Sequence, residues 1–148
     1  MDERNLSVIR NVLPKVLKEV EKELSQDPLV RESLRERSSL EKLMQLQNTL
    51  AKLFVRSLSG KKSLNGSVDK AIKENRVPYA AVFKAVAKVK ERLLKSLTNS
   101  EMDRVELLAA SKRLEELLNA VARAYLRSEG AELLHLIDSP FKEKFLFN

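Results

Sequence analysis

Apolar residues recur along this chain at intervals of three and four, which is the spacing of one face of an α-helix. The first such stripe consists of Leu6, Ile9, Leu13, Leu17, Val20 and Leu24. Similar stripes run through residues 43–58, 79–97 and 105–125, and no stretch alternates apolar and polar residues as a half-buried strand does. The sequence therefore predicts an all-α protein.

Prolines divide these stripes into separate helices. Pro14 lies inside the first stripe, and its missing N–H predicts a break there, with a second helix starting at Pro14. The Asp27-Pro28 pair predicts another interruption, followed by a short helix over 28–37. Pro78 then predicts the start of a helix over 78–98.

Two capping boxes, in which a Ser or Thr precedes a Glu by three residues, predict further helix starts. Ser38 with Glu41 is expected to open a long helix that ends at Ser59. Thr98 with Glu101 is expected to open the last long helix. We interpret residues 1–134 as one helical domain and residues 135–148 as a C-terminal linker.

Composition limits the class of protein. A chain of 148 residues suits one domain with its own apolar core. It has no cysteine, which excludes disulfides and thiolate metal sites and is compatible with a cytoplasmic protein. No apolar run approaches the ~20 residues that span a bilayer, so we expect no membrane partner.

Positive charge is concentrated in one segment. The net charge is +7, and residues 61–98 carry 10 basic and 3 acidic side chains. Four of these cations share one helix face, and we treat them as a candidate anion-binding face: Lys84, Lys88, Arg92 and Lys95. The favoured alternative is the solvated side of an amphipathic helix, because no aromatic residue lies between the cations. Nucleic acid is therefore not an expected partner.

Residues suited to catalysis are sparse. His135 is the only histidine, and neither a His pair nor a Glu-x-x-His motif occurs. Gly60 and Gly66 do not form a phosphate-binding loop. We interpret His135 as a surface or interface residue, with an axial haem ligand as the alternative. The sequence predicts no catalytic or metal site, and hence no enzyme within this chain.

The C-terminal tail carries three aromatic residues within residues 141–148. Two interpretations stand side by side. The tail docks on the domain, or the chain is part of a longer protein and the tail leads into a C-terminal output domain.

The order of these signals resembles that of globin-coupled sensor domains over residues 5–127. The segment Val20 to Arg31, with Asp27-Pro28-Leu29 and Arg31, resembles the early helix and corner of that family. Leu43 to Gly60 resembles its long pocket helix, and Val77-Pro78-Tyr79 its next helix start. The last long helix, through Ala124-Tyr125-Leu126, is also similar. The resemblance implies a globin-like helical sensor domain, and another antiparallel helical bundle is the alternative.

The resemblance also implies a protein without haem. Haem-binding members have a proximal histidine before the equivalent of Pro78, whereas Ile72 lies nearest that position here and has no lone pair for iron. We therefore expect no cofactor. Six residues are candidates for the lining of the central pocket: Leu50, Phe54, Ile72, Phe83, Val86 and Leu114. They form either a filled core or a site for an apolar ligand such as a fatty acid.

Dimerisation through the last two helices is implied by the same resemblance. Four residues are small or apolar enough for close helix contact between two copies: Ala109, Leu117, Ala120 and Ala124. We expect a homodimer in a bacterial signal-transduction protein that controls a cyclic-di-GMP cyclase or phosphodiesterase output domain. Two rival hypotheses are a basic helical nucleic-acid-binding protein and a helical scaffold subunit that binds another protein.

Overall fold

The computed structural model describes residues 1–34, 37–60 and 64–137, with side chains described for 1–34, 40–60 and 64–127. Within these ranges the fold is all-α, as the apolar stripes predict, and contains no strand. The helices are α1 (Glu3–Gln26), α2 (Pro28–Ser33), α3 (Arg37–Ser59), α4 (Asn65–Glu74), α5 (Tyr79–Thr98) and α6 (Arg104–Ile137). The tail and its aromatic residues lie outside the described residues, as does the side chain of His135.

Helix α1 passes through Pro14 without a break, so the predicted interruption is wrong. Because proline has no N–H, the carbonyl of Arg10, four residues earlier, loses its helical donor. Pro14 lies on the exposed side of α1, where water can hydrate that carbonyl, while Leu13 and Val16 on the inner side are buried. Core packing on both sides of Pro14 thus keeps the helix continuous.

Asp27 forms the corner between α1 and α2. It ends α1 and caps α2, because its Oδ1 accepts hydrogen bonds from the N–H of Leu29 at 2.9 Å and of Val30 at 3.3 Å. Helix α2 ends at Ser33, earlier than the predicted end at residue 37. The Asp-Pro pair therefore predicts the corner correctly but not the length of the helix that follows.

The start of α6 differs from its prediction. Thr98 is the last residue of α5, and its hydroxyl donates to the carbonyl of Leu94 at 2.7 Å rather than capping a new helix. Helix α6 begins at Arg104. The carbonyl of the preceding residue, Asp103, accepts the first hydrogen bond of the helix, from the N–H of Leu107 at 2.8 Å. The capping box of Thr98 and Glu101 is therefore not formed.

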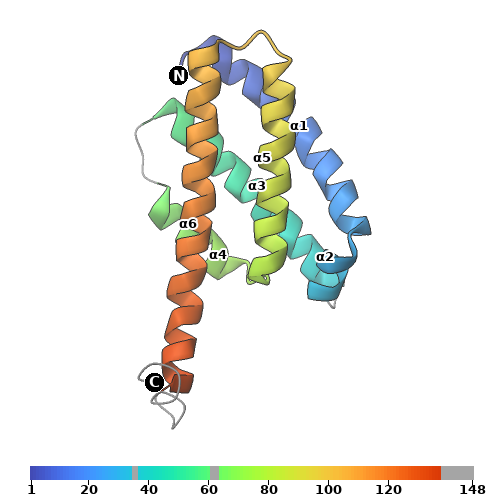
Figure 1. The fold of residues 1–148 in the computed structure, drawn as a ribbon, viewed down its shortest axis with the longest axis vertical. Coiled ribbons are helices and arrows are strands. Elements are labelled where there is room, and N and C mark those ends of the chain that lie inside the picture. The colour runs from blue at the N-terminus through green and yellow to red at the C-terminus, as the bar shows by residue number, and fades with distance from the viewer. Residues whose placement is uncertain (35–36, 61–63, 138–148) are drawn as a thin grey trace, which may run out of the picture.

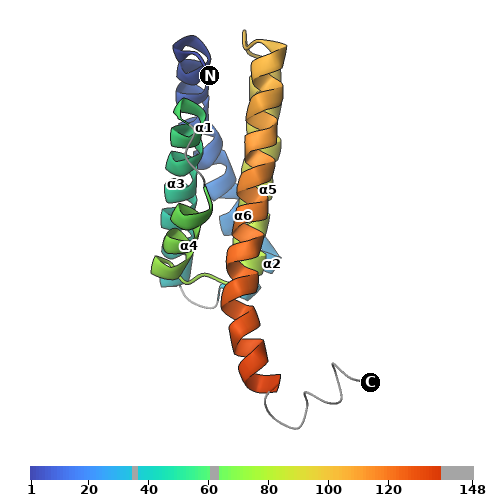
Figure 2. The same cartoon turned by 90° about the vertical axis from the view of Figure 1, so that its left-hand side faces the viewer.

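Two layers make up the domain. Helices α5 and α6 lie side by side and antiparallel in one layer, and α1, α3 and α4 form the other (Figures 1 and 2). In Figure 1, α1 and α3 run obliquely across the α5–α6 pair, so the arrangement is a crossed one rather than a simple up-and-down bundle. Helix α4 packs between α3 and α6. At its C-terminal end, α6 continues beyond the other helices.

A single apolar core fills the space between the layers. Its completely buried members come from α1, α2, α3, α4 and α5, and α6 adds Ala110, Leu114 and Val121. The buried hydroxyl of Tyr125 donates to the carbonyl of Val77 at 2.5 Å, which fixes α6 to the segment before α5. Among the described helices, none is both long and apolar enough to cross a bilayer.

Candidate functional site

The predicted anion-binding face on α5 begins at Lys84, and this residue is already paired. Its Nζ lies 2.5 Å from a carboxylate oxygen of Asp27, at the α1–α2 corner. The hydrogen bond from Lys84, together with those from the N–H groups of Val30 and Leu29, holds the pKa of Asp27 below its ordinary value. Lys84 thus fastens α5 to the corner instead of facing an outside anion.

The next two cations of the face are paired with α1. Lys88 lies 3.4 Å from Glu23, and Arg92 contacts both Glu23 and Glu19, the latter at 3.2 Å. Lys95 alone is exposed without an ion pair to any residue that the structure describes. Three of the four predicted cations therefore form a salt-bridge seam that joins α5 to α1 and to the α1–α2 corner, which leaves Lys95 as the exposed member of the predicted anion-binding face.

The predicted pocket is largely filled. Four of its six residues do surround one interior cavity, but that cavity measures only about 20 Å³: Leu50, Phe54, Val86 and Leu114. Ile72 is buried on α4 and does not line this space. Phe83 faces outward and is 44% exposed, with its ring 5.6 Å from that of Tyr79. Side chains from opposite layers thus occupy the centre of the domain.

Gln47 lines the same cavity and was not predicted as a site residue. Its side chain is 5% exposed, and neither amide atom has a hydrogen-bond partner. The sequence did carry a signal, because Gln47 lies on the inward stripe of α3 between Leu43 and Leu50. A polar residue on such a stripe is buried by its neighbours whatever its own preference.

The predicted dimer contacts on α6 mostly point into the domain itself. Leu117, Ala120 and Ala124 are buried, and only Ala109 is exposed. The reason is that α6 packs closely against both α5 and α4, and small residues serve those internal contacts. Leu117, Ala120 and Ala124 are therefore unable to contact a second copy directly.

A different face of α5 and α6 exposes apolar side chains. The rings of Tyr79 and Tyr125 lie 5.0 Å apart, and Lys90 pairs with Glu115, which fixes the antiparallel register of the two helices. Helical spacing places seven exposed or half-buried apolar residues on the side of α5 and α6 where Lys90 and Glu115 also lie, and we call these seven the outer strip: Phe83, Ala87, Leu94, Leu108, Leu118, Ala122 and Leu126. Leu108 and Leu126 are each 70% exposed.

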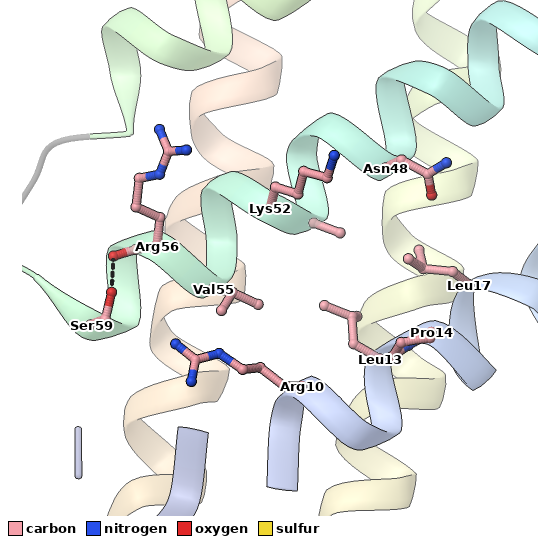
Figure 3. Close-up of a pocket in the computed structure, with 10 residues that line it drawn as sticks. Arg10, Leu13, Pro14, Leu17, Asn48, Lys52, Val55, Arg56 and Ser59 are labelled. Carbon is pink, nitrogen blue, oxygen red and sulfur yellow. Dashed lines mark hydrogen bonds between the residues drawn. The ribbon is translucent and has the colours of Figure 1, made fainter. Parts of the chain in front are cut away.

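A surface hollow lies in the other layer, between α1 and α3. It is an open groove of about 540 Å³, with residues of α1 along one side and of α3 along the other (Figure 3). Its floor is apolar and consists of Leu13, Pro14, Leu17, Ala51 and Val55. We call this feature the α1–α3 groove.

Three cations border the α1–α3 groove, and no carboxylate lines it. Arg10 projects from α1 and pairs with Glu3 at 2.8 Å. Lys52 and Arg56 project from α3, one helical turn apart, and are exposed (Figure 3). Neither makes an ion pair with a residue that the structure describes. The groove is thus apolar at its base and positive at its rim.

Metal ligation has no support in the described part of the chain, where no group of three or more His, Cys, Asp or Glu residues could hold an ion. Comparisons with family models, with curated proteins and with solved structures each gave no match to this chain. The geometry of the molecule therefore offers two candidate sites. One is the outer strip on α5 and α6, and the other is the α1–α3 groove, which has an apolar floor and a basic rim.

Proposed function

We propose that this chain is a globin-like sensory or regulatory module that works as a homodimer through the outer strip of α5 and α6. The observation that carries the proposal is the exposure of Phe83, Leu108 and Leu126, which helical spacing places on the same side of two antiparallel helices. Exposed apolar side chains gathered on one face are typical of protein interfaces. Two copies of such a helix pair would form a four-helix interface.

The arrangement of the helices supports the globin-like part of the proposal. Helices α1 and α3 cross the α5–α6 pair obliquely, and the short helix α4 packs between α3 and α6 (Figure 1). A corner at Asp27-Pro28 leads from the long helix α1 into the short helix α2. Crossed helices around a central core are what the sequence resemblance implies, whereas a parallel-sided bundle would argue against it.

The filled interior favours regulation by rearrangement of subunits over binding of a large internal ligand. The central cavity of about 20 Å³ has room for about one water molecule. Haem or a long acyl chain would need the helices to separate. The proposed module therefore responds at its surfaces, and the absence of a ligand donor at Ile72 is consistent with that.

Helix α6 offers a route for the signal. Its 34 residues extend about 51 Å at about 1.5 Å per residue. Its segment from Leu108 to Leu126 contributes to the outer strip, and its C-terminal end runs beyond the rest of the domain (Figure 2). A change in the packing of two α6 helices would move their projecting ends. The cyclic-di-GMP output remains a prediction from the resemblance.

The test is the oligomeric state of matched variants, measured by sedimentation velocity. We expect the wild-type chain to be a dimer and the double variant Phe83→Glu/Leu126→Glu to be a monomer with unchanged helix content. Leu29→Glu is the control, because Leu29 is 63% exposed but lies on α2, away from the outer strip. We expect this control to remain a dimer.

Two results would contradict the proposal. One is a wild-type chain that stays monomeric at about 100 μM, since a dimer on which regulation depends is expected to have a Kd below that concentration. The other is equal loss of the dimer in the Leu29→Glu control, which would place the interface elsewhere or indicate general destabilisation.

A further inference from the structure

We infer that the α1–α3 groove binds an acidic amphipathic helix of a partner protein. This inference goes beyond the proposed dimer, because the groove lies in the layer opposite the outer strip (Figure 2). A homodimer formed through α5 and α6 would leave both copies of the groove open. The module would then have one surface for self-association and another for its input.

The floor of the groove has the spacing of a helix-binding surface. Leu13 and Leu17 lie one turn apart on α1, and Ala51 and Val55 lie one turn apart on α3. Figure 3 shows Leu13 and Val55 directed into the space between the two helices. A third helix with apolar residues at i, i+4 and i+7 would place its side chains between these pairs. The small side chain of Ala51 permits its close approach.

The charges of the groove select an acidic helix. Lys52 and Arg56 stand on one rim without ion pairs to described residues, and Arg10 stands on the other side. Lys52 and Arg56 are one helical turn apart on α3, and this separation matches that of two carboxylates four residues apart on a bound helix. Since the lining contains no carboxylate and Glu3 is already paired with Arg10, a basic helix would find no free carboxylate there and would be repelled by Lys52 and Arg56.

The openness of the groove favours a helix over a small molecule. Sites for small molecules enclose most of the ligand surface, whereas this hollow of about 540 Å³ is open along its length between two exposed rims. Its α3 side extends from Asn48 to Ser59, about 16 Å along the helix axis. A bound helix of about three turns would bury less area than a stable interface does. The interaction is therefore expected to be weak and reversible.

The experiment uses the full chain and a stapled helical peptide of about 14 residues as the probe, read by fluorescence anisotropy. The peptide carries Leu at i, i+4 and i+7 and Glu on both sides of that stripe, and a matched peptide carries Lys in place of Glu. We expect saturable binding of the acidic peptide only. In the double variant Lys52→Glu/Arg56→Glu, the affinity for the acidic peptide should fall by about tenfold or more, and the basic peptide should gain affinity.

Controls separate this site from the rest of the surface. Lys95→Glu changes an exposed, unpaired cation on α5 and should leave peptide binding unchanged. The monomeric variant Phe83→Glu/Leu126→Glu should still bind the peptide, so failure of the dimer proposal and failure of this inference are distinguishable.

Four outcomes would overturn the inference. They are no saturable binding, equal binding of acidic and basic peptides, an affinity unchanged by Lys52→Glu/Arg56→Glu, and a change of oligomeric state in that variant, which would make a second copy the occupant. Vesicles that contain phosphatidylglycerol test the rival hypothesis that the groove binds an anionic membrane surface. Binding to vesicles that requires Lys52 and Arg56, without peptide binding, would assign the groove to an anionic membrane surface instead.

Discussion

Two sets of cations with the same helical spacing have opposite environments in this protein. On α5, Lys84, Lys88 and Arg92 follow one another at intervals of four residues and are all paired with carboxylates. On α3, Lys52 and Arg56 have the same spacing and are unpaired among the described residues. The difference arises outside either helix, in the part of α1 that each one faces.

Helix α1 supplies both environments. Its C-terminal half carries Glu19 and Glu23 toward α5, whereas its N-terminal half carries Leu13 and Pro14 toward α3, with Arg10 on the rim. Four of the five cations of α5 are therefore paired with carboxylates of the same molecule, whereas Lys52 and Arg56 on α3 remain available. Charge density along a sequence measures how many cations are present, not how many are free to bind a partner.

Reversal of charge at Glu23 is the most severe test of the paired region. Glu23 contacts both Lys88 and Arg92, so Glu23→Lys would place three cations together on a half-buried surface. We expect a loss of about 2 kcal/mol in the free energy of unfolding, between the values for exposed and buried pairs. Urea denaturation measures it. The exposed neighbour Glu21 is the control, and Glu21→Lys should change stability by less than about 0.5 kcal/mol.

An equally small loss in Glu23→Lys would mean that the seam between α1 and α5 contributes little to folding. The ion pairs would then result only from the proximity of the two helices, and the paired cations of α5 would stabilise the fold no more than the unpaired cations of α3 do.

Gln47 is an unpaired polar residue in the interior. A hydrogen-bonding group without a partner costs more free energy there than at the surface, where water can satisfy it. Both amide atoms of Gln47 are buried without partners. Gln47→Met keeps the shape of the side chain and removes that cost, so we expect a gain of about 1 kcal/mol in the free energy of unfolding. Gln45→Met, at an exposed position of the same helix, should have little effect. Thermal and urea unfolding measure both.

A loss of stability in Gln47→Met would have a specific meaning. The cavity beside Gln47 is large enough for about one water molecule. Such a water could both donate to and accept from the amide, and the substitution would remove that bond. A destabilised variant would therefore show that the amide is satisfied in solution.

The sequence predicts most of this fold because the apolar stripes are regular. The stripe of α1, from Leu6 to Leu24, is buried as predicted except for the half-buried Leu17, and the corner at Asp27 lies where the Asp-Pro pair places it. The errors occur where packing overrides a local signal. Pro14 does not break α1, because the residues on either side of it are held in the core. Thr98 remains in α5 rather than capping α6.

The candidate sites are less predictable because they depend on contacts between distant segments. Lys84 and Asp27 are far apart in sequence, and nothing local indicates that they pair. Ala120 and Ala124 have the small size of helix-contact residues, but that size does not reveal which neighbouring helix they contact. The α1–α3 groove joins two helices separated by a third, so no single stripe could reveal it.

The acid stability of the protein tests the Lys84–Asp27 pair. Because the pKa of Asp27 is lowered by folding, its charge stabilises the protein above the ordinary value of about 3.8, and this contribution is lost as pH falls through the lower folded value. Asn can still cap α2, so Asp27→Asn removes mainly the charge. We expect the variant to be less stable than wild type at pH 7 in urea, with a smaller difference near pH 3. A difference in stability between wild type and Asp27→Asn that is the same at both pH values would show that the charge of Asp27 does not stabilise the fold.

The smallest expected effect tests the unpaired cations directly. Lys52 and Arg56 are like charges one turn apart, which costs a helix a few tenths of a kcal/mol. Lys52→Glu places a carboxylate four residues before Arg56, the favourable order for an ion pair in a helix, so stability should rise by roughly 0.3–0.5 kcal/mol. The same substitution should weaken binding of the acidic peptide. A gain in stability with a loss of binding would indicate that Lys52 serves a partner rather than the fold, whereas a loss of stability would mean that Lys52 contributes to folding through a contact that the salt-bridge geometry does not reveal.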